Sequence, residues 1–102
     1  MKCDIVVTTC ALIFHEFLKG FSFPTVLIDE CSQATEPIAI LPLLKKAEHY
    51  ILVGDHMQLG PTVTSCKLKD SGYEKSLFER LLSLNRENNN THFLDVTITN
   101  II

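Results

Sequence analysis

The stretch that decides the fold is Val26-Leu27-Ile28-Asp29-Glu30. Three apolar residues, two of them β-branched, run directly into two adjacent carboxylates. A short apolar run of this kind predicts a strand buried on both faces of a parallel sheet. Ligand sites of open α/β sheets lie just beyond the carboxyl ends of the strands, where Asp29 and Glu30 are expected. On these residues alone, a solvated acidic turn explains the pair equally well.

The composition indicates a globular chain of one domain or less. Of its 102 residues, 46% are hydrophobic and 21% are charged, which is typical of chains with a packed core. The net charge of -3 excludes a global basic field that would attract nucleic acid or anionic membrane. No apolar run has the length of a membrane-spanning helix. We therefore expect a chain without membrane contact, in the cytoplasm or the nucleus.

The cysteines and histidines form no recognisable zinc-ligand pattern. The four cysteines include no C-x-x-C pair, and the four histidines are equally scattered; structural zinc sites need closely spaced ligands. We interpret the cysteines as reduced thiols that pack within the fold.

Predicted strands and helices alternate along the chain. Pro42 is expected to kink or shorten the second helix, and residues 71–74 fit a capping box at the start of the third. The alternation indicates an α/β fold with a largely parallel sheet. The predicted strands cover 4–9, 25–29, 50–53 and 93–98; the predicted helices cover 10–19, a segment that starts at 35–37, and 73–84; polar loops are predicted at 67–72 and 85–91.

The two central predicted strands each end in an acid. Asp29 and Glu30 end the first, and Gly54 and Asp55 follow the second. A carboxylate suits Mg²⁺, a hard cation that takes oxygen ligands, and a second carboxylate suits the deprotonation of an attacking water. Gln58, in the turn that follows, can hydrogen-bond a terminal phosphate through its amide. The pattern therefore predicts one half of a nucleotide hydrolysis site.

Two longer strings resemble a known family. VLIDECSQATEP (26–37) and ILVGDHMQLGPTV (51–63) resemble motifs II and III of superfamily 1 RNA helicases of the up-frameshift type. Residues 4–10 resemble the strand and nucleic-acid-contacting turn that precede motif II, and residues 76–81 resemble the helix after motif III. All four pieces stand in the expected order. The resemblance implies a partial RecA-like P-loop NTPase domain, with residues 1–96 as the C-terminal portion of the first RecA-like helicase domain and 97–102 as a divergent tail.

The resemblance implies ATP and Mg²⁺ as cofactors. It also implies RNA or single-stranded nucleic acid, and decay-factor proteins, as partners of the full-length helicase. Asp29 of the Walker B motif would coordinate Mg²⁺, Glu30 would be the catalytic base, and Gln58 would sense the γ-phosphate. The remaining implied site residues are two that support nucleotide binding, Gln33 and Asp55, and four along the nucleic-acid path, Thr8, Thr9, Gly60 and Pro61.

One element of such a site is missing from the sequence. No G-x-x-x-x-G-K-[ST] phosphate-binding loop occurs, and this loop cradles the phosphates of the nucleotide. By the resemblance it would lie upstream, with a second motor domain downstream, so we expect a partial gene product that hydrolyses no ATP alone. The rival interpretation is a non-enzymatic interaction module that binds a partner through uncovered sheet edges and faces. A third is an unstable fragment without a role of its own.

Overall fold

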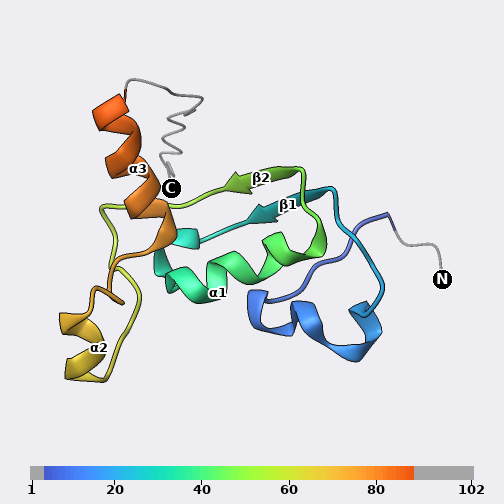
Figure 1. Cartoon of the computed structure of the whole chain (residues 1–102), viewed down its shortest axis with the longest axis horizontal. Coiled ribbons are helices and arrows are strands. Elements are labelled where there is room, and N and C mark those ends of the chain that lie inside the picture. Colours follow the sequence, from blue (N-terminus) through green and yellow to red (C-terminus); the bar gives the residue numbers. More distant parts are fainter. Residues whose placement is uncertain (1–3, 89–102) are drawn as a thin grey trace, which may run out of the picture.

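Two short parallel strands form the centre of the molecule (Figure 1). The computed structural model describes residues 4–88. Strand β1 (Thr25–Ile28) pairs with β2 (His49–Leu52), and Leu27 lies opposite Ile51. The α/β fold and the parallel pairing are thus confirmed within the described residues. No helix among them is long and apolar enough to cross a membrane.

The connection between the strands is a series of short helical turns. It comprises η3 (Cys31–Gln33), α1 (Glu36–Ile40) and η4 (Leu41–Lys45). The effect predicted for Pro42 is confirmed, because α1 ends at Ile40 and the chain continues as a 3₁₀ helix. Proline lacks the N–H that an α-helix interior requires but is accepted in a first turn.

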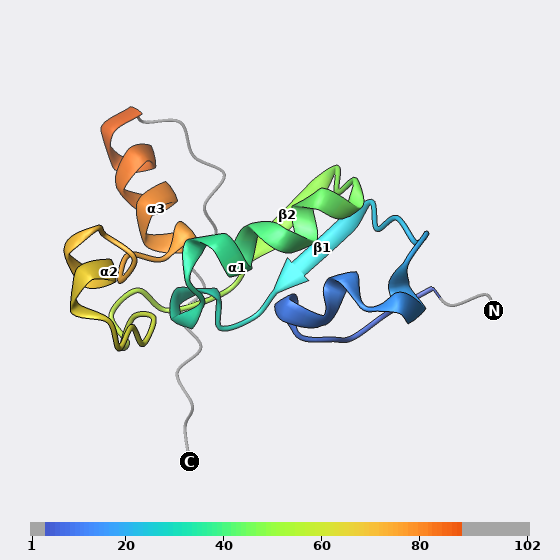
Figure 2. The ribbon, with the colours of Figure 1, turned by 60° about the horizontal axis from the view of Figure 1, so that its bottom comes forward.

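The N-terminal segment departs from the prediction (Figure 2). Residues 5–9 are not a strand, and 10–19 form two 3₁₀ helices, η1 (Cys10–Phe14) and η2 (Glu16–Leu18), in place of one helix. Strand propensity reflects how well side chains pack on a sheet. Val7 is 93% exposed, so its β-branched side chain gains no such packing here.

The C-terminal helix is shifted relative to the prediction. The predicted loop 67–72 contains α2 (Cys66–Asp70), and α3 runs over Leu77–Asn88 instead of 73–84. The capping box at 71–74 is therefore wrong. Its role falls to Ser76, whose Oγ accepts a hydrogen bond from the Glu79 N–H at 3.1 Å, the bond that caps a helix start. The helix also replaces part of the predicted loop 85–91, while the predicted strand 93–98 and the tail 97–102 lie outside the described residues.

The core lies on one face of the sheet. The buried centre of the core consists of Ile28 from β1, Cys31 from η3 and Phe78 from α3. The core therefore joins these three elements. On the other face Leu27 is 60% exposed and Ile51 is 46% exposed. The prediction of a strand buried on both faces is therefore wrong for the described residues.

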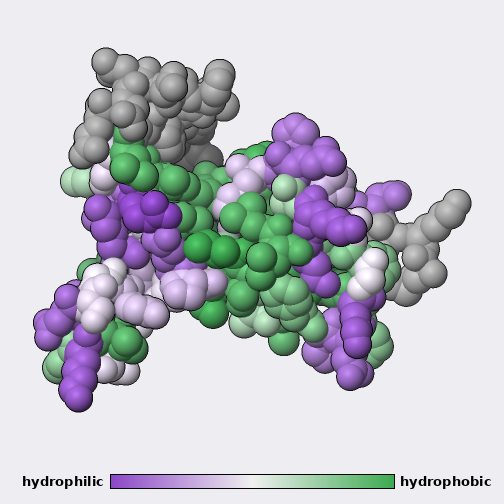
Figure 3. Space-filling view, in the orientation of Figure 1, coloured by the Kyte–Doolittle hydropathy of each residue, from purple (hydrophilic) through white to green (hydrophobic). Residues whose placement is uncertain are grey.

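Apolar side chains also gather on the surface over the middle of the molecule, where Figure 1 places α1 (Figure 3). The partly buried side chains packed on the core are Cys10, Val26, Tyr50, Leu52 and Leu82.

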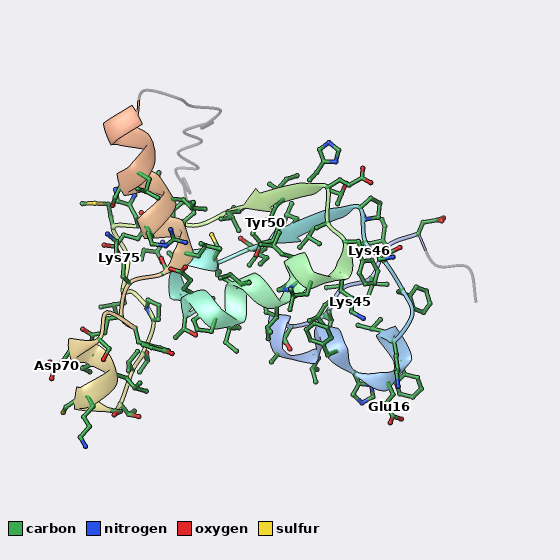
Figure 4. All side chains as sticks on the ribbon, viewed as in Figure 1. Glu16, Lys45, Lys46, Tyr50, Asp70 and Lys75 are labelled. Atoms are coloured by element: carbon green, nitrogen blue, oxygen red, sulfur yellow. The ribbon has the colours of Figure 1, made fainter. Side chains whose placement is uncertain are left out.

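Three polar contacts fix the helical turns around this core. Figure 4 shows Tyr50 between the strands and α1, where its hydroxyl donates to the Ala39 carbonyl; burial raises the pKa of Tyr50 to about 12. Lys45 is buried and donates from Nζ to the Leu18 carbonyl at 2.9 Å. The third contact is a bidentate ion pair between Arg80 and Glu36, with N–O distances of 2.8 and 2.7 Å. Together these contacts hold η2 to η4, β2 to α1, and α1 to α3.

The backbone ladder extends beyond both strands. The Val53 N–H donates to the Ile28 carbonyl at 2.8 Å, and the Cys31 N–H donates to the Val53 carbonyl at 2.9 Å. Gly54 then passes so close to η3 that a Cβ there would lie 3.1 Å from both the Cys31 Sγ and the Ser32 backbone nitrogen. The chain segments that leave β1 and β2 are therefore held together where the strands end.

This close approach predicts that Gly54→Ala destabilises the chain. The added methyl group must displace η3, and overpacking of this kind costs about 1–3 kcal/mol. The midpoint of urea unfolding measures the loss. Gly60→Ala is the comparison, because its added Cβ would have one near neighbour, the Glu74 carbonyl oxygen at 3.3 Å. Equal midpoints for Gly54→Ala and the wild type would contradict the close packing.

The Arg80–Glu36 pair predicts a pH-dependent contribution to stability. The hydrogen bonds from Arg80 hold the pKa of Glu36 below its usual range, so the folded state favours the ionised carboxyl. The contribution is present above the unfolded pKa of about 4.3 and is lost as the pH falls through the lower folded pKa.

Urea unfolding of wild type and Glu36→Gln should therefore give midpoints that differ above about pH 5 and converge in more acidic solution. The difference should be modest, because the pair is partly exposed and solvent screens it. Glu74→Gln, which breaks the exposed pair with Lys69, is the matched control. A midpoint difference for Glu36→Gln that persists unchanged at low pH would refute the assignment.

Candidate active site

Two carboxylates lie at the carboxyl end of β1. Asp29 and Glu30 are exposed, and the Glu30 N–H donates to the Asp29 Oδ1 at 2.9 Å. Glu30 has a φ of 52° and a ψ of 33°, a left-handed conformation that costs a residue with a Cβ about 1–2 kcal/mol. This conformation turns the chain sharply from the strand into η3. Strained backbone is often found at functional sites.

The turn of η3 brings Gln33 back to Glu30. The Gln33 Nε2 donates to the Glu30 Oε2 at 3.2 Å, which matches the three-residue spacing of one 3₁₀ turn. Gln33 therefore holds one oxygen of the Glu30 carboxylate. The Glu30 side chain is oriented by its own loop before any ligand arrives.

The loop after β2 has a similar arrangement. The Asp55 Oδ1 accepts from the Met57 N–H at 2.9 Å, and the Asp55 Oδ2 accepts from the Gln58 Nε2 at 3.3 Å. A backbone bond from the Gln58 N–H to the Asp55 carbonyl, at 3.3 Å, closes the same turn. Each loop thus contains a carboxylate and a glutamine three residues apart, joined through their side chains.

Gln33 and Gln58 line a common groove of about 790 Å³. The structure therefore brings together the two loops that the sequence linked only through their positions after successive strands. Three lining residues were not predicted from the sequence: Met57, Leu59 and Thr62. Met57 and Leu59 flank Gln58 and are 82% and 90% exposed. The sequence signal that could have identified these two residues is their position on either side of Gln58, in the turn after β2.

The four residues predicted along a nucleic-acid path fall into two separate places. Thr8 and Thr9 are exposed and lie in the segment that leads into η1, whereas Gly60 is exposed and Pro61 is buried in the loop after β2. Figures 1 and 2 place these two segments well apart, on either side of α1. A ligand that contacts both has to extend across the molecule.

The donor groups at the end of β1 fit Mg²⁺. Carboxylate oxygens are hard ligands, and Mg²⁺ is usually bound through one or two of them together with substrate phosphates and water. The Asp29 Oδ1 accepts the Glu30 N–H, and the Asp29 side chain is exposed. Within residues 4–88 no three His, Cys, Asp or Glu side chains group closely enough to hold a metal ion by themselves.

The thiol beside the site is unsuited to chemistry. Cys31 is 1% exposed, and burial raises its pKa to about 11, with a smaller contribution from the nearby Asp29 and Glu30 carboxylates. The thiol therefore stays protonated at neutral pH, whereas a nucleophile must be a thiolate. Burial also raises the pKa of Cys10. Both thiols pack in or against the core, as predicted. Cys66 is exposed, so the prediction that it packs within the fold is wrong.

Comparison with known proteins identifies the family. A model of the AAA domain matches residues 1–66. Regulator of nonsense transcripts 1 of Dictyostelium discoideum is 48% identical over 83 residues, which are 81% of this chain and 6% of that protein. ATP-dependent helicase NAM7 of Saccharomyces cerevisiae is 49% identical over 83 residues, 81% of this chain and 8% of that protein. Uncharacterized ATP-dependent helicase MJ0104 of Methanocaldococcus jannaschii is 42% identical over 81 residues, 79% of this chain and 12% of that protein.

The chain spans only 6% to 12% of the length of these three relatives. The family model covers both Asp29–Glu30 and the turn that contains Gln58, and the small parallel sheet is consistent with part of a RecA-like domain. The resemblance to up-frameshift helicases is confirmed, and the chain belongs to the AAA domain family, in the part that it shares with superfamily 1 helicases of the nonsense-transcript regulator type.

Proposed function

We propose that this chain provides the metal-binding and water-activating half of an ATP hydrolysis site in an RNA or DNA helicase. The observation that carries the proposal is the pair of loops after β1 and β2, which present Glu30–Gln33 and Asp55–Gln58 at the same end of one parallel sheet. Ligand sites of α/β sheets lie at this end. The names of the relatives, ATP-dependent helicases and regulators of nonsense transcripts, support the same function.

Each residue of the two loops has a role that its geometry supports. Asp29, whose carboxylate is exposed, would hold Mg²⁺. Glu30 accepts the proton of the attacking water, with one oxygen already fixed by Gln33. Gln58, fixed by Asp55, contacts the terminal phosphate and detects its release. Bound Mg-ATP supplies the phosphoanhydride that is cleaved and the metal charge that stabilises the leaving phosphate. Thr8, Thr9, Gly60 and Pro61 lie along the nucleic-acid path, and cytoplasmic decay factors are the expected protein partners.

The 102-residue chain alone is expected to hydrolyse no ATP, because its sequence has no phosphate-binding loop. The direct test inserts its matched residues into NAM7 in place of the equivalent stretch. The chimera should hydrolyse ATP, and Glu30→Gln should lower its turnover about 10²–10⁴-fold, the range for loss of a general base. Release of phosphate measures both rates.

Glu74→Gln in the same chimera is the matched control, since Glu74 is exposed and paired with Lys69. Two results would contradict the proposal: a chimera with Glu30→Gln that is as active as its parent, or ATP turnover by the isolated chain that Glu30→Gln abolishes.

A second candidate function is a non-enzymatic interaction module. It is favoured by the uncovered sheet face, where the paired side chains of Leu27 and Ile51 are 60% and 46% exposed. Parallel sheets are normally covered on both faces, so a partner that covered this face would gain apolar contact. The chimera separates the two functions, because the module gives no turnover that depends on Glu30.

A further inference from the structure

The hydroxyl of Ser32, in η3, is buried without a hydrogen-bond partner. Ser32 is 4% exposed, and its Oγ is shielded from solvent and makes no hydrogen bond within residues 4–88. Ser76 is also buried, but its Oγ accepts the Glu79 N–H. A buried polar group that lacks a partner costs free energy, and nearly all such groups in folded proteins are paired. The Ser32 hydroxyl therefore favours any conformation that offers it a partner.

The Ser32 hydroxyl lies beside Gly54, in the loop after β2. A Cβ built on Gly54 would be 3.3 Å from the Ser32 Oγ. The peptide before Gly54 is fixed, because its carbonyl, that of Val53, accepts the Cys31 N–H. The next peptide carries the Gly54 carbonyl, which accepts no hydrogen bond from the described residues. Glycine has no side chain to restrict rotation of this peptide, so the Gly54 carbonyl can turn toward the Ser32 Oγ.

Gly54 is also the point at which the turn that contains Gln58 can pivot. Val53, before it, is held through both its N–H and its carbonyl by the chain that leaves β1. After it, the Asp55 side chain braces the turn 55–58 through two hydrogen bonds, so the turn moves as one unit. Gly54 alone joins the fixed part to the braced part. Figure 1 shows both strands ending on the same side, toward α3, where this junction lies.

We propose that Ser32 is a positioning residue of the hydrolysis site. When Mg-ATP binds, Gln58 moves to the terminal phosphate, the peptide after Gly54 rotates with it, and the Ser32 hydroxyl donates a hydrogen bond to the Gly54 carbonyl. With ADP, which lacks the terminal phosphate, Gln58 and Gly54 keep the positions that they have in the free chain. The new bond joins the loop that contains Glu30 to the phosphate sensor in the ATP-bound state alone. This inference rests on the proposed function.

The first test compares urea unfolding of the 102-residue chain and its variants. Ser32→Ala should leave the midpoint unchanged or raise it, because no hydrogen bond is lost and an unpaired polar atom is removed. Ser76→Ala is the matched control: it removes a buried hydroxyl that has a partner and should lower the midpoint. A lower midpoint for Ser32→Ala would overturn the proposal, since the hydroxyl would then have a partner before any nucleotide binds.

The second test measures nucleotide affinities of the NAM7 chimera by isothermal titration calorimetry. The probes are a non-hydrolysable ATP analogue and ADP, both with Mg²⁺. Ser32→Ala should weaken binding of the analogue about two- to tenfold, the contribution of one neutral hydrogen bond, and leave the ADP affinity unchanged. Ser32→Thr, which keeps the hydroxyl, should restore the affinity for the analogue. Ser76→Ala should change neither affinity.

The same titrations separate this inference from the proposed function. If Ser32→Ala weakens both nucleotides equally, or neither, Ser32 is not a positioning residue. If Gln58→Ala weakens binding of the analogue in that case, the proposed phosphate contact stands without Ser32. If Gln58→Ala leaves the affinity unchanged and Glu30→Gln leaves the turnover unchanged, the proposed function fails and this inference fails with it.

Discussion

The hydrogen bonds that continue the sheet past its strands are the constraint on which the candidate site depends. Val53 receives the Cys31 N–H on its carbonyl and gives its own N–H to Ile28. These two bonds join the loop that contains Glu30 to the loop that contains Asp55 and Gln58, at the point where each loop leaves its strand. Gly54 then passes η3 so closely that a Cβ there would lie 3.1 Å from the Cys31 Sγ and the Ser32 backbone nitrogen. Without this junction the two loops would be independent surface turns, and the groove lined by Gln33 and Gln58 would have no fixed shape.

The same junction explains how a small core supports an exposed site. Cys31 is buried directly after Glu30, in contact with the cluster of Ile28 and Phe78, so the residue that follows the proposed base is held in place by α3. The Arg80–Glu36 pair fixes the other end of the connection. The candidate catalytic groups are therefore exposed side chains on backbone that is anchored on both sides. Sites of this kind can exchange ligands without losing the geometry that orients them.

The sequence predicted the centre of the fold well, because its patterns there are local. β-Branched and apolar runs that end in acids correctly predicted both strands, and Pro42 correctly predicted the end of α1. The failures come from tertiary context. The β-branched residues at 5–7 satisfy strand propensity, but strand formation requires a packed sheet neighbour. The capping box at 71–74 and the one at 76–79 are similar in sequence, and the burial of Ser76, Leu77 and Phe78 selects the second. The open face of Leu27 and Ile51 was also unpredictable, since a run of apolar residues does not tell which elements cover it.

For the site, the sequence identified the polar residues that follow each strand. The side-chain pairs Glu30–Gln33 and Asp55–Gln58 could not be predicted, because they depend on the conformation of the turns.

Hydrogen exchange of individual backbone amides, followed by NMR on the 102-residue chain, tests the junction most directly. The amides of Cys31 and Val53 should exchange as slowly as the hydrogen-bonded amides of β1 and β2, since all would open in one cooperative unit. The amide of Leu59, in the exposed turn beyond the junction, serves as the fast reference. If Cys31 and Val53 exchanged as fast as Leu59 while the strand amides stayed protected, the two loops would not be joined, and the candidate site would lose its structural basis.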